Sequence, residues 1–107
     1  VKNNAKRYLI RIEDVVYCKA ADNYCEIYLL ENKHLVSRTL KSVTERILHK
    51  NFRRVNRSFF VNMDFVQHID RDNRIHFKFP IKHNNQAVDP QIVIAQNAMK
   101  DFSSWTL

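Results

Sequence analysis

Apolar and polar positions alternate over the first part of the chain with the period of a β-strand. Apolar side chains recur at every second position from Tyr8 to Ile12, which predicts a strand over this segment. Glu13-Asp14 interrupts the pattern. Further strands are then predicted over residues 15–18, 24–30 and 35–38, separated by a polar loop at 20–23 and a turn at 31–33.

The period changes after residue 38. Apolar residues now recur at helical spacing, at Leu40, Val43, Ile47 and Leu48. Thr39 belongs to the residue types that commonly cap a helix N-terminus. We therefore expect a helix of about three turns. It should end near residues 50–51 and support the segment that follows with its buried face.

The second half is less regular. Residues 52–66 mix apolar and basic positions without a clean period, and a hairpin is expected around residues 70–73. Residues 80–90 are polar and are expected to form a loop with Ile81 as its main apolar anchor. A final strand over 91–95 and a short C-terminal helix over 97–105 complete the prediction. Many short strands with one good helix predict a mainly β, or α+β, fold.

Composition narrows the possible functions. The chain of 107 residues suits a single domain over residues 1–107, and it contains no glycine. Glycine-rich phosphate loops, Rossmann fingerprints and nucleophile elbows are therefore excluded. Turns must use other residues, and asparagine tolerates left-handed backbone angles best. The candidate turn residues are Asn3-Asn4, Asn32, Asn73 and Asn84-Asn85.

The charge balance is strongly basic. Eighteen Lys and Arg stand against eleven Asp and Glu, which gives a net charge of +7. Such an excess on a small domain favours an anionic partner, most often nucleic acid, although ordinary solubility charge is the alternative. No apolar run approaches the roughly 18 residues of a membrane span. Two cysteines are too few for a disulfide scaffold and are typical of a reducing compartment, so a cytoplasmic location is expected.

Metal binding and catalysis find little support. Cys18 and Cys25 would face opposite sides of one continuous strand, and the five histidines are scattered without ligand spacing. Glu13-Asp14 is better placed to end a strand, and Asp70 and Asp72 to make a turn, than to act as a catalytic pair. No Ser, Cys or Thr has a recognisable nucleophile context. We therefore expect no enzymatic activity, no metal and no cofactor.

A basic cluster is the most informative local feature. Arg53, Arg54 and Arg57 are interleaved with Asn56 and Ser58. Arg and Asn are suited to bidentate contacts with base edges, and Arg and Ser also bind phosphates. Flanking phenylalanines could anchor the cluster to the core. A solvated, salt-bridged surface patch is the alternative.

The same segment carries a family resemblance. Residues 52–63, FRRVNRSFFVNM, resemble the pattern F-x-R-V-H-R-S-[FY]-[IL]-V-N-L, and residues 12–24 resemble I-x-x-x-D-I-x-Y-I-E-A-x-G-N-Y. Between them, residues 38–43 are similar to R-x-T-L-x-x-L. These three ordered segments are similar to the LytTR family of DNA-binding domains. The resemblance runs from about Arg7 to Val66 and is looser at residues 92–97, where the family has V-P-V-S-R.

The resemblance implies a compact, mostly β fold that binds duplex DNA sequence-specifically, often at paired direct repeats, where a dimer on the DNA is possible. It also implies the output domain of a bacterial transcription regulator, behind a receiver domain of a two-component response regulator, so the chain is expected to be a C-terminal fragment. The DNA-binding residues carried over by position are Asp22, Asn23, Tyr24, Arg54, Asn56, Arg57, Ser58, Gln96, Asn97 and Lys100. Among them, Arg57 is expected to contact a base and Arg54 a phosphate; the alternative is that both contact phosphates, because arginine contacts to phosphate outnumber those to bases.

Three positions depart from the family pattern. Asn56 replaces the usual His, Asp22 the usual Gly and Gln96 the usual Arg, and residues 80–90 form a longer stretch than usual. These changes leave the target sequence open.

Two other functions remain alternatives. An RNA- or single-strand-binding module could stack bases on Tyr24 or Phe59. A basic protein-interaction or dimerisation domain would instead associate with itself without affinity for DNA.

Overall fold

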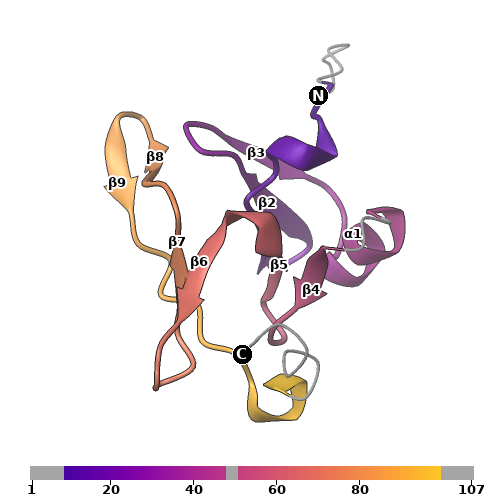
Figure 1. Ribbon diagram of the computed structural model, residues 1–107. Helices are drawn as coiled ribbons and strands as arrows, with labels where there is room; N and C mark the ends of the chain where they lie inside the picture. The colour runs from indigo at the N-terminus through magenta and orange to yellow at the C-terminus, as the bar shows by residue number, and fades with distance from the viewer. Residues whose placement is uncertain (1–8, 48–50, 100–107) are drawn as a thin grey trace.

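The computed structural model describes residues 9–47 and 51–99, which form mainly short strands (Figure 1). The first half contains η1 (Ile12–Asp14), β1 (Tyr17–Ala21), β2 (Tyr24–Tyr28), β3 (Lys33–Val36) and α1 (Leu40–Arg46). The second half contains β4 (Phe52–Arg54), β5 (Phe59–Asn62), η2 (Met63–Phe65), β6 (Val66–Ile69), β7 (Ile75–Phe77), β8 (Ile81–His83) and β9 (Gln86–Val88). This content confirms the mainly β fold with one main helix.

The first five strands form one antiparallel sheet in the order β3-β2-β1-β5-β4. The strands β6-β7 and β8-β9 form two separate hairpins. Figure 1 shows the five-stranded sheet between α1 on one side and the two hairpins on the other. Because side chains alternate along a strand, each face of this sheet contributes to a different part of the core.

The face under α1 holds the smaller apolar cluster. Its buried members are Val15, Cys18, Cys25, Ile27, Leu40, Val43, Phe52 and Phe60. Phe52 and Phe60 stack at a centroid distance of 5.1 Å, on the pair of strands that flanks the basic cluster. The helix therefore supports the strands that carry the cluster, as the sequence predicts.

Both cysteines lie in the apolar cluster under α1 and are fully buried. They are free thiols on neighbouring strands, where Cys25 opposes Ala20 and Cys18 opposes Ile27. Burial in apolar surroundings raises the pKa of the Cys18 thiol to about 12 and also raises the pKa of Cys25. Neither thiol is therefore activated as a nucleophile.

The opposite face holds the larger, aromatic part of the core. Tyr17 stacks on Tyr28 at 4.4 Å between ring centroids and packs against Phe59 and Phe77 at 5.8 and 5.9 Å. The two hairpins and residues 92–94 cover this face. Ile81, predicted as the anchor of its segment, is only 3% exposed within this cluster.

Helix α1 begins where the sequence predicts and ends earlier. The hydroxyl oxygen of Thr39 accepts a 3.2 Å hydrogen bond from the backbone N–H of Ser42, as an N-cap should. Leu40 and Val43 are buried, whereas Ile47 follows the last helical residue and is half-buried. The helix has seven residues, about two turns, because the chain becomes extended at Ile47.

The turns are made without glycine. Asn73, Asn84 and Asn85 have φ of 63°, 54° and 63°, which confirms their predicted role, and Asp22 and Gln91 share the left-handed region. The pair Asn84-Asn85 joins β8 to β9 with positive φ at both positions, as a type I′ hairpin turn requires. Asn32 lies at its predicted turn without positive φ, and Asn3-Asn4 lies outside the described residues.

Several predicted elements differ in the structure. The predicted strand at Tyr8 to Ile12 is wrong for its described part, because residues 9–11 have no neighbouring strand and η1 follows. Residues 80–90 contain the β8-β9 hairpin instead of a loop. The predicted strand at 91–95 is reduced to one bridge, between Arg74 and Val93. Residues 96–99 form a short 3-10 turn, and the rest of the predicted C-terminal helix lies outside the described residues.

Among the residues that the structure describes, no helix is both long and apolar enough to span a bilayer.

Candidate nucleic-acid interface

Three segments distant in sequence meet at one end of the sheet. They are the β1-β2 turn, the β4-β5 loop (residues 55–58) and residues 95–99. The backbone N–H of Ala20 donates to the carbonyl of Ser58 at 2.8 Å, and the N–H of Ala95 donates to the carbonyl of Val55 at the same distance. In Figure 1, the loop and residues 96–99 lie at the lower end of the molecule.

Asn56 shapes the β4-β5 loop from within. Its side-chain oxygen Oδ1 accepts hydrogen bonds from the backbone N–H groups of Ser58 at 2.8 Å and Phe59 at 3.0 Å. This is the local pattern by which Asn side chains fix turns. The backbone N–H of Val55 closes the loop by donating to the carbonyl of Phe59 at 3.1 Å.

The other half of the Asn56 amide reaches outside the loop. Its Nδ2 donates a 2.8 Å hydrogen bond to the carbonyl of Val93. Val93 in turn forms the isolated bridge with Arg74, next to the β6-β7 turn. Asn56 therefore connects the β4-β5 loop to the segment that leads into residues 95–99.

Arg54 lies against the same loop. Its Nε donates to the carbonyl of Asn56 at 3.0 Å, and an Nη2 hydrogen donates to the carbonyl of Arg57 at 2.9 Å. Two of the five N–H donors of this guanidinium are thus used on the backbone of the loop. Its positive charge lies beside the loop and not at its tip.

Arg57 and Ser58 are exposed at the surface of the loop. Within the described part of the chain, no hydrogen bond or ion pair engages the guanidinium of Arg57, which leaves all its donors available to a ligand. A shallow hollow of about 370 Å³ adjoins the loop. It is lined by Arg54, Asn56, Arg57, Ala95, Asn97 and Ala98.

The β1-β2 turn presents the next candidate residues. Asp22 and Asn23 are exposed, and the Tyr24 side chain is 47% exposed. Asp22 has φ 55°, which explains why glycine suits this position in the resembling sequences. Its carboxylate places a negative charge at the same end as Arg57.

The structure brings the remaining candidates together only in part. Asn97 is exposed and lines the hollow beside Arg57, whereas Gln96 is exposed without lining it. A 2.9 Å bond from the N–H of Ala98 to the carbonyl of Ala95 shapes their turn. Lys100 lies outside the described residues.

Two exposed cations at this end were missed by the sequence reasoning. Lys19 is directly opposite Phe59 in the β1-β5 pairing, beside the β4-β5 loop. It was detectable as the charged residue within an otherwise apolar strand. Arg74 approaches the loop through its bridge to Val93, a long-range pairing that no local pattern reveals.

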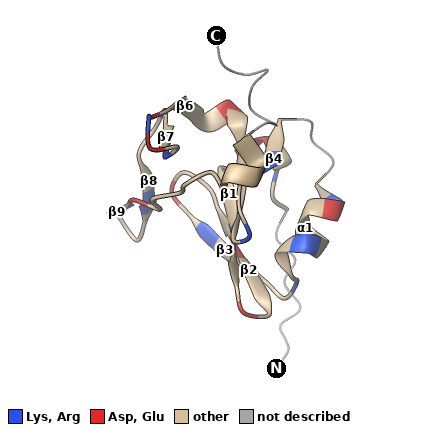
Figure 2. Cartoon of the chain, turned by 90° about the horizontal axis from the view of Figure 1, so that it is seen from below, with Lys and Arg blue, Asp and Glu red and all other residues tan. Residues whose placement is uncertain are grey.

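Basic and acidic residues are both distributed over the chain. Figure 2 views the molecule from below, and it shows basic positions on α1, β3, β4 and β8 and acidic positions on α1 and in several turns. The described ion pairs lie elsewhere, at Arg11–Glu13, Lys33–Glu26 and His76–Asp70. None of these three pairs involves Lys19, Arg54, Arg57 or Arg74.

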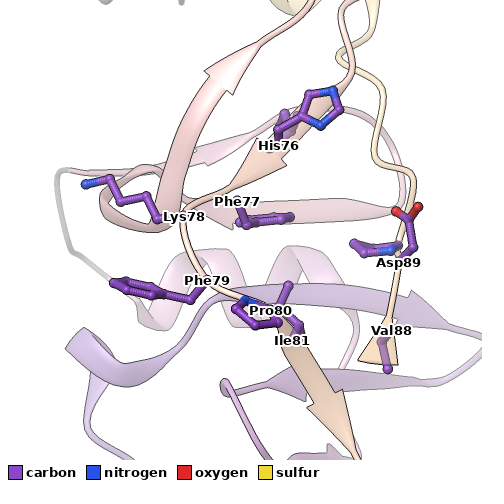
Figure 3. Close-up of a pocket in the computed structure, with 10 residues that line it drawn as sticks. His76, Phe77, Lys78, Phe79, Pro80, Ile81, Val88 and Asp89 are labelled. Atoms are coloured by element: carbon purple, nitrogen blue, oxygen red, sulfur yellow. The ribbon is translucent and has the colours of Figure 1, made fainter. Parts of the chain in front are cut away.

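A second hollow, of about 350 Å³, lies between β7 and the β8-β9 hairpin (Figure 3). The Nε2 atom of His76 lies 2.8 Å from Oδ2 of Asp70, and Oδ1 of Asp89 accepts a bond from the N–H of Gln91 at 3.2 Å. Lys78 extends away from the hollow. The polar side chains of His76 and Asp89 in this hollow therefore make hydrogen bonds within the fold. Within residues 9–47 and 51–99, no three His, Cys, Asp or Glu residues are grouped to hold a metal ion.

Comparisons with known proteins identify the fold and the family of the chain. A search among curated proteins found no match. One solved structure, a LytTr DNA-binding domain from Bacillus cereus assigned to a methyl-accepting/DNA response regulator, superposes with a TM-score of 0.66 at 19% identity. The match covers 96% of this chain and 90% of that one, and it shows a shared fold. The sequence model described as the LytTr DNA-binding domain matches residues 5–106. The chain therefore belongs to the LytTR family of DNA-binding domains.

Proposed function

We propose that the chain binds duplex DNA sequence-specifically, as the output domain of a bacterial transcription regulator, and has no enzymatic activity of its own. The observation that carries the proposal is the position of Arg57. Its unpaired guanidinium projects from a loop whose backbone is fixed on both sides by hydrogen bonds. Such a side chain can make a bidentate contact with guanine in the major groove.

The segments at this end of the sheet would make two kinds of contact with DNA, to phosphates and to base edges. Exposed cations, among them Lys19 and Arg74, would contact phosphates and set the orientation of the domain. Arg57, Asn23 and Asn97 would approach base edges from three different segments. Because the segments are held side by side by backbone hydrogen bonds, they can contact the duplex together.

The wider context is proposed from family membership. The whole chain would act as one domain behind a receiver in a two-component response regulator. Paired direct repeats would recruit two copies, which would form a dimer on the DNA.

The single-strand alternative loses one of its two aromatic platforms. Phe59 is half-buried and packs against Tyr17 at 5.8 Å between centroids, so its ring does not offer a free face. Of Tyr24 and Phe59, only Tyr24 is exposed. Competition between duplex and single-stranded probes of the same sequence separates these functions, and stronger binding to the single strand would contradict the proposal.

The decisive experiment selects bound duplexes from a random pool and then measures the affinity for the selected site against salt. Binding through a handful of phosphates should weaken by about 10³- to 10⁵-fold between 50 and 200 mM salt. A selected motif with a steep salt dependence is the expected result. A pool without enrichment, or an affinity that does not respond to salt, would refute sequence-specific duplex binding.

A further inference from the structure

The side chains of Arg54 and Asn56 hold the β4-β5 loop in place through hydrogen bonds, and this set of bonds is called the brace below. Each of the five hydrogen bonds that these two side chains make ends on a backbone group. We propose that Arg54 and Asn56 are positioning residues that hold the loop for recognition by Arg57 and Ser58. This inference rests on the proposed duplex binding and reassigns the two residues that the family resemblance placed in contact with DNA.

Arg54 is suited to this task by the shape of its side chain. Its Nε and Nη2 donors reach two different carbonyls of the loop, those of Asn56 and Arg57. The two donors belong to one rigid, planar group, so together they fix both the position and the orientation of the loop backbone. A lysine at this position would keep the charge, but its flexible ammonium would not reproduce the rigid two-point contact.

The side chain of Asn56 is not free to contact a base through both its oxygen and its nitrogen. An asparagine that recognises adenine uses its side-chain oxygen and nitrogen together. Here Oδ1 already accepts from Ser58 and Phe59, and Nδ2 donates to Val93. A bidentate contact with adenine would require Oδ1 to give up one of its two loop hydrogen bonds, whereas Arg57 can bind a base without such a rearrangement.

The brace has a consequence for specificity. A loop that is already in its binding conformation loses little conformational entropy when DNA binds. Without the brace, Arg57 would still be attracted to phosphates but would no longer be directed at one base. Loss of Arg54 should therefore reduce discrimination between sequences more than it reduces general affinity for DNA.

The test compares Arg54→Lys, Arg54→Ala and Asn56→Asp with the unchanged chain. Lys82→Ala serves as the matched control, because it removes one exposed cation from β8, outside the loop. Asn56→Asp keeps the acceptor oxygen, removes the donor to Val93 and adds a negative charge, so its effect is judged from discrimination between sequences and not from overall affinity. Two quantities are measured: amide hydrogen exchange of Ser58 and Phe59 in the free protein, and affinities for the selected duplex and its single-base variants at several salt concentrations.

If the brace holds the loop, Arg54→Lys and Arg54→Ala should raise the rate of amide hydrogen exchange at Ser58 and Phe59 by about tenfold or more. Both should reduce discrimination between the selected site and its variants. Arg54→Ala should leave the slope of log affinity against log salt unchanged. Asn56→Asp should reduce discrimination as well, and Lys82→Ala should change neither exchange nor discrimination.

A phosphate contact by Arg54 gives the opposite result. Arg54→Lys would then retain both affinity and discrimination, and Arg54→Ala would lower the salt slope by about one unit with protection intact. Either outcome would overturn the inference. Exchange is measured without DNA, so it tests the brace even if the chain failed to bind duplexes. If Arg54→Ala did not fold, Arg54→Lys would still decide between the two roles.

Discussion

The side-chain amide of Asn56 donates a 2.8 Å hydrogen bond to the carbonyl of Val93, 37 residues further along the chain. This contact joins the basic segment to the C-terminal part of the domain. Residues 95–99 are thereby held beside the β4-β5 loop, together with the bond from Ala95 to Val55. The candidate interface is thus one continuous surface built from separate parts of the sequence.

Arg57 is expected to discriminate between bases. Arg57→Ala should flatten the preference at one base position, with a loss of about 1–3 kcal/mol of discrimination against the wrong base. Arg57→Lys keeps the charge and should retain general binding while losing the same preference, because an ammonium lacks the bidentate geometry. Affinities for the selected site and its single-base variants measure the effect. Equal losses on every variant would remove the base-reading role.

Asp22 is expected to weaken binding to every duplex. Asp22→Asn removes its negative charge and retains a residue that tolerates the left-handed backbone seen here, with φ 55°. Affinity should rise by about twofold to tenfold at low salt, and the gain should shrink as salt screens the charge. Asp22→Gly should behave in the same way. Weaker binding to the selected site alone would instead mean that Asp22 accepts a hydrogen bond from a base.

Leu40 is expected to be essential for stability and dispensable for recognition. Its side chain is 4% exposed and packs in the cluster with Phe52 and Phe60. Leu40→Ala should reduce the free energy of unfolding by about 2–5 kcal/mol. The exposed neighbour Lys41→Ala should change it by less than about 0.5 kcal/mol. Urea denaturation measures both, and equal stabilities would show that the helix does not support the strands.

Asp70 is expected to make stability depend on acidic pH. Its hydrogen bond with His76, followed by bonds from the backbone N–H groups of Arg74 and Asp72, lowers the pKa of its carboxyl to about 2. The unfolded chain has a pKa near 3.9, roughly the value for free Asp. The stabilisation is therefore fully present above about pH 4 and is lost as the pH falls towards 2.

Unfolding experiments between pH 5 and pH 2 check this expectation. The unchanged chain should lose stability more steeply than Asp70→Asn over this range. Asp72→Asn removes an equal charge from the same turn, where no side-chain hydrogen bond holds Asp72 among the described residues, and should follow the unchanged chain. Identical curves for the unchanged chain and Asp70→Asn would contradict the role of this carboxylate.

Local patterns in the sequence were sufficient where the structure is local. The spacing of Leu40 and Val43 and the cap at Thr39 predicted where helix α1 begins. The absence of glycine directed attention to Asn73, Asn84 and Asn85, and all three adopt positive φ. Such features depend on a few neighbouring residues, and the physical preferences of those residues decide them.

Features that depend on distant partners could not be predicted in the same way. The alternation at Tyr8 to Ile12 predicts a strand, but residues 9–11 have no adjacent strand with which to pair. Two prolines and a polar composition concealed the β8-β9 hairpin, whose Ile81 and Val88 form a cross-strand pair. The basic segment at residues 53–58 stays a predicted interface. The engagement of Asn56 with Val93 could not be inferred from its type.

The burial of Cys18 and Cys25 has a practical consequence for spectroscopy. Thiol-reactive dyes and spin labels attack the thiolate, and both native thiols are inaccessible and kept protonated by their surroundings. A single cysteine introduced at an exposed position of the β8-β9 hairpin, such as Gln86, would therefore be labelled selectively in the folded protein. The native sequence thus accepts a fluorophore at a chosen distance from the β4-β5 loop without prior removal of its own cysteines.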